Sequence, residues 1–415
     1  MRKRLIALLE AVVFKIRLVD IENEREARYQ IERVGSDQAG VAAMFRKTMT
    51  INLKVYNLKL PQAHILKQEM LAIGGDTAVA REVLVGGVER TDVLIIGTLK
   101  QLYELCRRLL RQPFSMKKLA EEIREILSNI GKDKFIWKIR DRELLLGEKT
   151  IIMGILNVTP DSFSDGGLYI DKDKAIKHGI ELFESGAEII DVGGESTRPF
   201  AEPVLADEEI RRVIPVVEAL KNYNKNIIVS VDTYKSETAK RALEAGADII
   251  NDISGLTFDS NMKHVVSQYK AGLVLMHTRG TPQEMQKNTE YADFMGEAVE
   301  SLNKSIKDAL DAGIEKERIV IDPGIGFGKS FEHNLFILKK LREFSIFGLP
   351  ILVGTSRKSF LGKITGKDAS LRDDETMVSV GIAIINGAHI VRVHEVKRMV
   401  DAVKVADAIR NAQMF

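Results

Sequence analysis

Polar side chains stand near the carboxyl ends of eight short apolar runs in the last two thirds of the sequence. These side chains are amides, acids, bases and a hydroxyl: Asn157, Asp191, Asp232, Asn251, His277, Asp322, Ser356 with Arg357 and Lys358, and Arg392 with His394. An acid or amide that follows a strand is often the N-cap of the next helix, which is the alternative interpretation for each residue alone. Capping does not explain Asp232 and Asp322, because further loop residues follow each of them before a helix could start.

These residue types favour a site with two halves. Several hydrogen-bond acceptors suit a flat heterocycle with N–H donors, and the acceptors are Asp232, Asn251 and Asp322. Positive charge that could bind phosphate comes from Arg198, Lys358, Arg392 and His394. The pattern therefore predicts a phosphorylated or diphosphorylated heterocycle as the ligand, unless these cations pair with local acids such as Asp373 and Glu395.

Familiar nucleotide and metal motifs do not fit the same residues. The run DPGIGFGKS is similar to a phosphate-binding P-loop, but Pro323 stands where that motif needs a glycine. His394 lacks the second histidine of a zinc-binding helix. Cys106 is the single cysteine, which excludes an internal disulfide and a thiolate metal cage. We therefore expect a reducing, cytoplasmic location.

Charge and hydropathy limit the classes of partner. The 415 residues include 61 Lys and Arg against 59 Asp and Glu, a formal net charge of +2. This balance gives no reason to expect a nucleic-acid or membrane partner, and no run approaches the ~18 apolar residues of a membrane span. The first residues, MRKRLIALLEAVVF, predict an element of the fold rather than a signal peptide, because Glu10 interrupts the apolar stretch.

The apolar runs that carry the polar residues are typical of buried parallel strands. They lie at 151–158, 188–194, 227–233, 248–254, 272–278, 319–324, 351–356 and 390–395. An amphipathic segment follows each run, so the α/β pattern predicts a (β/α)8 TIM barrel whose strands share one mouth. An open doubly wound sheet is the alternative, but eight regular units favour closure. Three helices end in a Gly-Ala step, where glycine suits a left-handed helix stop.

The first third of the chain predicts a smaller N-terminal α/β domain, residues 1–112, whose role the sequence does not reveal. We expect strands at 12–21 and 50–58, a helix at 23–35, and a strand that runs into a helix over 91–112. A helical linker is expected at 113–134. The barrel unit, 135–415, would start with a hairpin that turns near residues 140–143 and closes the bottom of the barrel.

Seven motifs follow one another along the predicted barrel: MGILNVTPDSFSDGG, DVGGESTRP, SVDTYK, NDISG, DPGIGFGK, GTSRKSF and RVHEV. Over residues 135–415 they resemble the dihydropteroate synthases, the pterin-binding TIM-barrel family of folate biosynthesis. The resemblance implies condensation of (7,8-dihydropterin-6-yl)methyl diphosphate with 4-aminobenzoate, giving 7,8-dihydropteroate and diphosphate. It also implies Mg²⁺ as a cofactor and a homodimer formed through barrel helices. Glu395 stands where the family more often has aspartate, and MHTRG replaces a commoner variant.

The resemblance also implies a role for each motif residue. The pterin would be bound by Asp232, Asn251, Met276, Asp322, Phe327 and Lys358. The diphosphate would be bound by Asn157, which would also hold the metal, and by Thr197, Arg198, Arg392 and His394. The aminobenzoate pocket and its loops would use Phe163, Asp165, Thr197, Arg198, Pro199, Ser356 and Arg357. The catalytic residues would be Asp232, Asp322, Lys358, Arg392 and His394.

Two other functions use parts of the same pattern. A pterin-dependent methyltransferase on this barrel would share the ring-binding acids, but it has no use for a diphosphate-binding half and should lack SFSDGG, STRP and SRKSF. A non-catalytic pterin-binding module need not retain Asn157, Arg198, Lys358 and Arg392, all of which are present.

Overall fold

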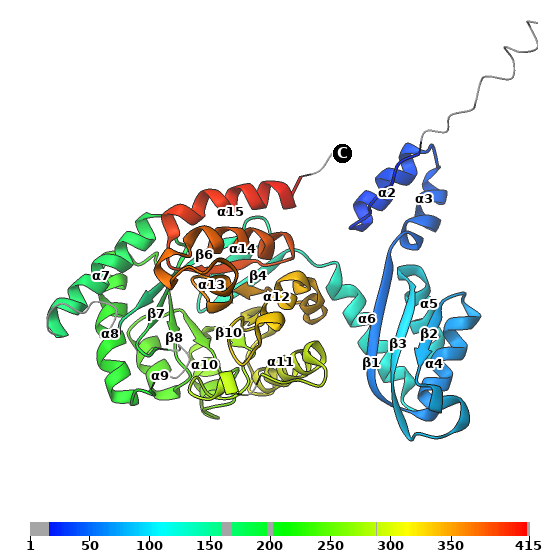
Figure 1. Ribbon diagram of the computed structural model, residues 1–415, viewed down its shortest axis with the longest axis horizontal. Coiled ribbons are helices and arrows are strands. Elements are labelled where there is room, and N and C mark those ends of the chain that lie inside the picture. Colours follow the sequence, from blue (N-terminus) through cyan, green and yellow to red (C-terminus); the bar gives the residue numbers. More distant parts are fainter. Residues whose placement is uncertain (1–15, 160–167, 197–201, 288, 413–415) are drawn as a thin grey trace, which may run out of the picture. The chain divides into compact units, whose positions relative to one another are not determined.

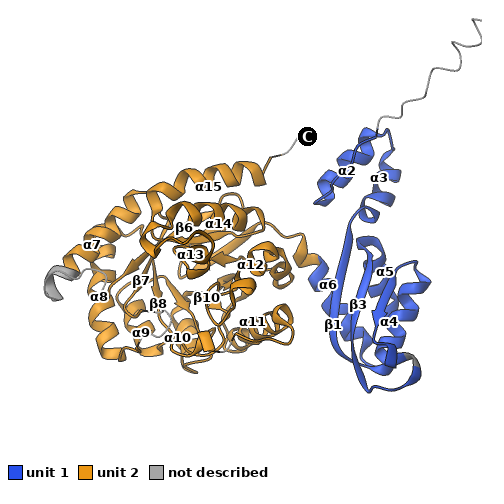
Figure 2. Cartoon of the chain, in the orientation of Figure 1, with its two compact units in different colours: residues 1–127, 415 blue, residues 128–414 orange. Residues whose placement is uncertain are grey.

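The computed structural model describes residues 16–159, 168–196, 202–287 and 289–412. The chain divides into two compact units, one that ends at Leu127 and one that begins at Ser128 (Figure 2). None of the described helices is both long enough and apolar enough to cross a membrane.

The first unit contains a three-stranded antiparallel sheet with the order β1-β3-β2. Its strands are β1 (Thr50–Lys59), β2 (Asp76–Val79) and β3 (Arg90–Thr98). Its helices are α2 (Glu24–Arg33), α3 (Gln38–Met44), η1 (Phe45–Lys47), α4 (Leu60–Ala72), η2 (Arg81–Val85), α5 (Leu99–Leu109) and the start of α6 (Met116–Ile130). The apolar side of β3 packs with α4, α5 and α6 into one core, because alternate residues of that strand are buried.

Most elements expected in the first third of the chain are confirmed, and one is wrong. The strand at 50–58, the helix at 23–35 and the strand running into a helix over 91–112 are present as β1, α2, and β3 with α5. Residues 16–21, the described part of the expected strand at 12–21, are not in a strand. Ile16 and Leu18 in this segment are exposed, so its alternating apolar side chains do not pack into a core. The expected boundaries at 112 and 134 stay predictions; α6 contributes Leu127 to the core of the first unit.

The second unit is a parallel eight-stranded barrel. Its strands are β6 (Ile151–Asn157), β7 (Ile189–Gly193), β8 (Ile228–Asp232), β9 (Ile249–Asp252), β10 (Gly272–Met276), β11 (Ile319–Asp322), β12 (Leu352–Val353) and β13 (Ile390–Val393). Their order is β11-β10-β9-β8-β7-β6-β13-β12. A parallel bridge between Ile321 and Ile351, with a hydrogen bond of 3.0 Å from the Ile321 N–H to the Pro350 carbonyl, joins β11 to β12 and closes the barrel. The TIM-barrel prediction is confirmed.

Helices surround these strands (Figure 1). They are α7 (Leu168–Glu184), α8 (Ala206–Tyr223), α9 (Ser236–Glu244), α10 (Met262–Tyr269), η4 (Met285–Lys287), α11 (Phe294–Asp311), η5 (Lys316–Arg318), α12 (Phe331–Lys339), η6 (Leu341–Phe347), α13 (Ser359–Thr365), η7 (Ala369–Leu371), α14 (Asp373–Ile385) and α15 (Val396–Arg410). The three Gly-Ala steps end α7, α9 and α14, and their glycines have φ between 106° and 107°. The Ala187 N–H then donates to the Leu182 carbonyl at 3.1 Å, which is the bond expected of such a stop.

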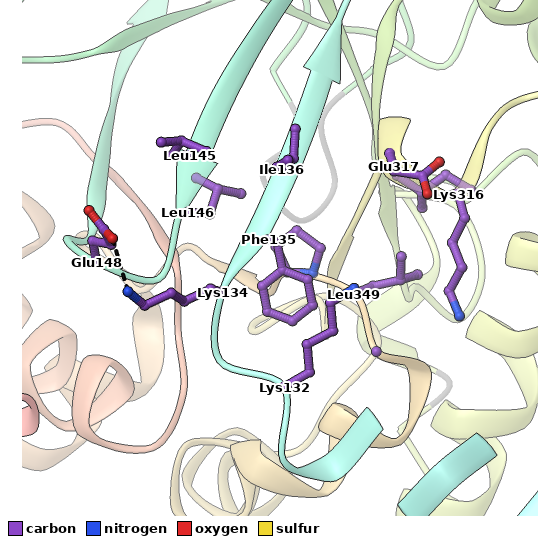
Figure 3. A pocket seen from close by; sticks show the side chains of 13 residues that line it. Lys132, Lys134, Phe135, Ile136, Leu145, Leu146, Glu148, Lys316, Glu317 and Leu349 are labelled. Atoms are coloured by element: carbon purple, nitrogen blue, oxygen red, sulfur yellow. Dashed lines mark hydrogen bonds and ion pairs between the residues drawn. The ribbon is translucent and has the colours of Figure 1, made fainter. Parts of the chain in front are cut away.

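A hairpin closes the lower end of the barrel, as predicted. It consists of β4 (Phe135–Ile139) and β5 (Arg142–Leu146). Its apolar side chains pack against the first residues of the barrel strands, and the buried Trp137 donates from Nε1 to the Arg318 carbonyl at 2.9 Å. A cavity of about 460 Å³ beside this hairpin is lined in part by Phe135, Leu146 and Leu349 (Figure 3). Because this cavity lies at the amino ends of the strands, it is remote from the polar mouth.

Candidate active site

The predicted site residues lie at the carboxyl ends of the barrel strands. Asn157 ends β6, Asp232 ends β8, Met276 ends β10 and Asp322 ends β11, while Arg392 lies within β13. The strands bury their apolar residues on both faces, and most of the predicted site residues lie toward their carboxyl ends. Parallel strands therefore direct these groups to a single mouth, where barrel enzymes keep their active sites.

An ionic network occupies the centre of this mouth. Arg392 donates from Nε to Oδ2 of Asp191 at 2.6 Å and from Nη2 to Oδ2 of Asp232 at 2.8 Å. Asn251 donates from Nδ2 to the same Asp191 oxygen at 3.1 Å. Four strands, β7, β8, β9 and β13, thus contribute to one cluster. One arginine bridges two buried carboxylates, so its charge is already partly neutralised before any ligand binds.

Two oxygen atoms in this cluster have no hydrogen-bond partner among the described residues. They are Oδ1 of Asp191 and Oδ1 of Asp232, and both are buried. A buried acceptor without a partner costs about 1–3 kcal/mol, so such atoms usually accept from water or from a ligand. The cluster therefore presents acceptors to a guest that carries N–H donors.

Burial shifts the pKa of the charged groups at the mouth. It raises the pKa of Asp232, while the Arg392 guanidinium opposes the shift. Burial also raises the pKa of Asp322, against the hydrogen bond of 2.7 Å that its Oδ1 accepts from the Gly324 N–H. The ammonium of Lys358 responds in the opposite sense, and burial lowers its pKa to about 8. The protonation of the site is therefore sensitive to pH on both sides of neutrality.

An apolar wall adjoins these polar groups. Met276 and Phe327 form a buried cluster with Ile253 and Met285. The Lys358 ammonium lies 4.2 Å from the centroid of the Phe327 ring. An apolar surface next to convergent acceptors and one cation is typical of a pocket for a flat polar heterocycle. The structure thus brings together Asp232, Asn251 and Arg392 in one network and Met276 with Phe327 and Lys358 in another.

The turn after β11 requires glycine for this arrangement. Gly324 has a φ of +72°, and a Cβ added there would lie 1.9 Å from the His277 carbonyl oxygen. The same turn places the Gly324 N–H on Asp322. The DPG sequence therefore fixes the loop after β11 against the loop after β10.

The residues predicted to bind the anion and the aminobenzoate differ in how far other side chains already engage them. Ser356 Oγ lies 2.8 Å from Nδ1 of His394 and accepts from the His394 N–H at 3.2 Å. The Arg357 guanidinium donates to Asp373 at 2.9 and 3.2 Å and to Glu395 at 3.4 Å. Asp373 and Glu395, the acids named above as alternative partners of the other cations, thus pair with Arg357. Oδ1 of Asn157 lies at the ends of β6 and β7, 3.6 Å from the position of a Cβ at Gly193.

Five predicted residues of the first two loops lie outside the described residues, namely Phe163, Asp165, Thr197, Arg198 and Pro199. The described base of the second loop is held by Glu195, which accepts from the Val204 N–H at 3.1 Å and from the Tyr234 hydroxyl at 2.8 Å. The Lys235 ammonium also pairs with Glu195 and, at 3.1 Å, with the buried Glu209. The two described ends of this loop are therefore joined through one carboxylate.

Sequence reasoning gave no role to several residues that the structure places at or beside the site. Asp191 was recognised as a polar strand end but not as the partner of Arg392. Glu195 and Lys235 lie within the DVGGE and VDTYK motifs, and Lys329 lies within DPGIGFGK. In the sequence, only their place within these motifs points to a role at the site. Their partners are residues distant in sequence or backbone atoms, which the sequence does not reveal.

The chain is similar to known proteins over most of its length. Residues 153–394 match the family model described as "Pterin binding enzyme". A dihydropteroate synthase of Synechocystis is 45% identical over 281 residues, which are 68% of this chain and 94% of that protein. A probable bifunctional folylpolyglutamate synthase/dihydropteroate synthase of Haloferax volcanii is 37% identical over 409 residues. This alignment covers 94% of the chain, so it extends into the first unit, but it covers only 47% of the relative. The chain thus spans about half the length of that bifunctional protein.

The barrel is also similar to a solved structure of a dihydropteroate synthase. The dihydropteroate synthase of Xanthomonas albilineans, determined with 4-aminobenzoic acid, matches with a TM-score of 0.63 and 39% identity. The match covers 68% of this chain and 100% of that chain. The family model spans more than half of the 415 residues. The chain therefore belongs to the pterin-binding enzyme family, and within it to the dihydropteroate synthases.

Proposed function

We propose that the chain condenses (7,8-dihydropterin-6-yl)methyl diphosphate with 4-aminobenzoate, giving 7,8-dihydropteroate and diphosphate. The observation that carries the proposal is the buried cluster in which Arg392 bridges Asp191 and Asp232, while two carboxylate oxygens find no partner in the described part of the chain. This cluster offers acceptors to a ring and keeps a cation beside them, which matches a heterocycle with an anionic leaving group. Membership of the dihydropteroate synthases supports the same reaction.

The pterin ring is held by the acceptor side of the mouth in this proposal. Asp232 and Asp322 accept from ring N–H groups, and Asn251 completes the polar edge. Met276 and Phe327 contact the faces of the ring, since they form the apolar wall. Lys358 lies over Phe327 and can donate to a ring acceptor. The two buried acids also stabilise positive charge that develops on the ring.

The reaction needs no covalent bond to the protein. The bond between the pterin methylene carbon and the diphosphate oxygen breaks, and the electron pair leaves with diphosphate. The cation that remains is delocalised into the ring beside Asp232. The amine of 4-aminobenzoate then forms the new C–N bond and releases a proton. Arg392 and His394, with Thr197 and Arg198, compensate the charge of the leaving group.

Asn157 fits the magnesium ion that the family resemblance implies. Mg²⁺ prefers hard oxygen ligands and is usually bound by one or two protein groups together with substrate phosphates and waters. The amide oxygen of Asn157 stands at the ends of β6 and β7 and supplies one such ligand. Among the described residues, no group of three His, Cys, Asp or Glu side chains could form a protein-only cage. When bound, the ion would neutralise charge on the diphosphate.

The second substrate occupies the outer part of the mouth in this proposal. Ser356, held by His394, faces the aminobenzoate with Phe163, Asp165, Thr197, Arg198 and Pro199 of the first two loops. Arg357 acts through its main chain, because its guanidinium is engaged by Asp373 and Glu395. Its φ of +57° is held by Arg372, which donates to the Arg357 carbonyl at 3.1 Å. This turn orients Ser356 and Lys358 on either side of it.

We also propose a homodimer formed through α14 and α15. These adjacent helices expose the apolar side chains Val378 and Ile382 on α14 and Val405 and Ile409 on α15, between 47 and 65% exposed. Exposed apolar patches of this kind mark protein interfaces. Val405→Glu should convert the dimer to a monomer in light scattering; a monomeric wild-type protein would refute this proposal. We place the protein in the cytoplasm, because its single cysteine allows no internal disulfide.

The function is tested by identifying the product. Purified protein is incubated with both substrates and Mg²⁺, and mass spectrometry should detect dihydropteroate. Omission of 4-aminobenzoate should abolish that product. A pterin-dependent methyltransferase would give no dihydropteroate, and a binding module would leave both substrates unchanged, so either result would overturn the proposal.

A further inference from the structure

A lysine is buried behind the proposed ring site and takes no part in the chemistry described above. Lys329 is 2% exposed. Its Nζ donates to the Phe327 carbonyl at 2.9 Å and to the His277 carbonyl at 3.1 Å. Lysine is almost never fully buried unless it is paired, because its ammonium loses hydration. The burial of Lys329 therefore requires an explanation.

The two carbonyls belong to loops that carry the apolar wall. His277 directly follows Met276 at the end of β10, and Phe327 lies in the loop after β11. Lys329 therefore links, through two hydrogen bonds, the backbone segments that carry Met276 and Phe327. The loops also approach closely at Gly324, where an added Cβ would overlap the His277 carbonyl. The relative position of Met276 and Phe327 depends on this junction.

The charges that face Lys329 come from several elements. Burial is the largest influence on Lys329 and lowers its pKa to about 7. Asp322 of β11 favours the protonated form of Lys329, and Lys358, which precedes α13, disfavours it. His277 and His333 lie nearby, and burial is the main cause that lowers the pKa of each, with Lys329 contributing in the same direction. Asp322 is thus the one carboxylate among these groups.

We propose that Lys329 is a positioning residue for the pterin-binding half of the site. Its amino group fixes Met276 and Phe327 against each other by donating to the backbone carbonyls beside them, and its protonated form favours the ionised state of Asp322, which contacts the ring in the proposed function. This inference rests on the proposed function, since it assigns Lys329 to the pterin rather than to the second substrate. Loss of Lys329 should therefore weaken pterin binding selectively.

The test compares two buried lysines. Lys329→Met removes the donors and the charge but keeps the length of the side chain. Lys221→Met is the matched control, because Lys221 donates to the Ile227 carbonyl at 2.7 Å and pairs with Asp248 at the amino ends of the strands. KM for each substrate, kcat, Tm and the Kd of 6-hydroxymethylpterin by calorimetry are measured for both variants and the wild type.

We expect Lys329→Met to raise KM for the pterin diphosphate and Kd for 6-hydroxymethylpterin about tenfold, because Met276 and Phe327 are then no longer held in the positions that contact the ring. KM for 4-aminobenzoate should change less than about twofold. Lys221→Met should lower Tm without changing either KM. If Lys329→Met does not fold, Lys329→Gln, which keeps an N–H donor but no charge, is judged by the same criteria.

Two outcomes would overturn the proposal. One is an unchanged pterin Kd in a folded Lys329 variant, and the other is an equal rise of KM for both substrates. Failure of the proposed function would look different, because the wild type itself would then form no dihydropteroate. The calorimetric Kd does not depend on turnover, so it reports on Lys329 in either case.

Discussion

Asp232→Asn should separate ring recognition from folding. Oδ2 of Asp232 accepts from Arg392 at 2.8 Å, and Oδ1 is buried without a partner among the described residues. Asparagine keeps one oxygen but turns the other into a donor. Either the ring or Arg392 then faces that donor, so one charged hydrogen bond is lost, at about 1.5–3 kcal/mol. The affinity for the pterin should fall about 10- to 100-fold.

The fold should survive this substitution. Arg392 keeps its 2.6 Å hydrogen bond to Asp191, so it does not become an unpaired buried charge. Asp248→Asn is the matched control, because Asp248 is a buried acid paired with Lys221 at the opposite ends of the strands. Calorimetry with 6-hydroxymethylpterin and thermal melting are measured on both variants. Asp232→Asn with unchanged pterin affinity, or with a loss equal to that of Asp248→Asn, would refute the role given to Asp232.

Three further predictions concern pH, backbone and domain organisation. Burial raises the pKa of Asp322 and lowers that of Lys358 to about 8. The value of kcat/KM for the pterin diphosphate should therefore fall as a drop in pH protonates Asp322, and it should fall again above about pH 8 as Lys358 loses its proton. Lys358→Arg should move the alkaline limb to higher pH, and a wild-type profile that stays flat to pH 10 would contradict this prediction. Gly324→Ala should lower Tm and pterin affinity more than Gly366→Ala, because both glycines have φ near +72° but Gly366 has nothing within 4 Å of the added Cβ; equal effects would show that the His277 carbonyl does not matter. Removal of residues 1–127 should leave an active barrel, since the matched Xanthomonas enzyme is covered over 100% of its length by 68% of this chain; a folded truncation without activity would make the first unit part of the catalytic protein.

The barrel was predictable from sequence because buried parallel strands leave a simple pattern. Each apolar run became a strand, although the strands are shorter than the runs: 351–356 contains only the two-residue β12. The polar residues Asn157, Asp232 and Asp322 still pair in the ladder as the last residues of their strands. The strand expected at 12–21 failed over its described part because apolar alternation does not by itself supply a neighbouring strand or a core.

The site could be predicted as a set of residues but not as a network. Asp191 at a strand end is consistent with a helix cap, and its pairing with Arg392 joins residues 201 positions apart. Lys329 is consistent with an ordinary exposed lysine until its two carbonyl partners are known. The engagement of Arg357 by Asp373 likewise depends on how the loop before α13 meets α14. Such pairings arise from tertiary contacts, which neither periodicity nor residue type specifies.

The most direct test of the central claim is the release of diphosphate by the purified chain with Mg²⁺. We predict release only when the pterin diphosphate and 4-aminobenzoate are both present, with one diphosphate formed for each dihydropteroate. Diphosphate release that is independent of 4-aminobenzoate, or no release with both substrates, would contradict the assignment of this chain as a dihydropteroate synthase.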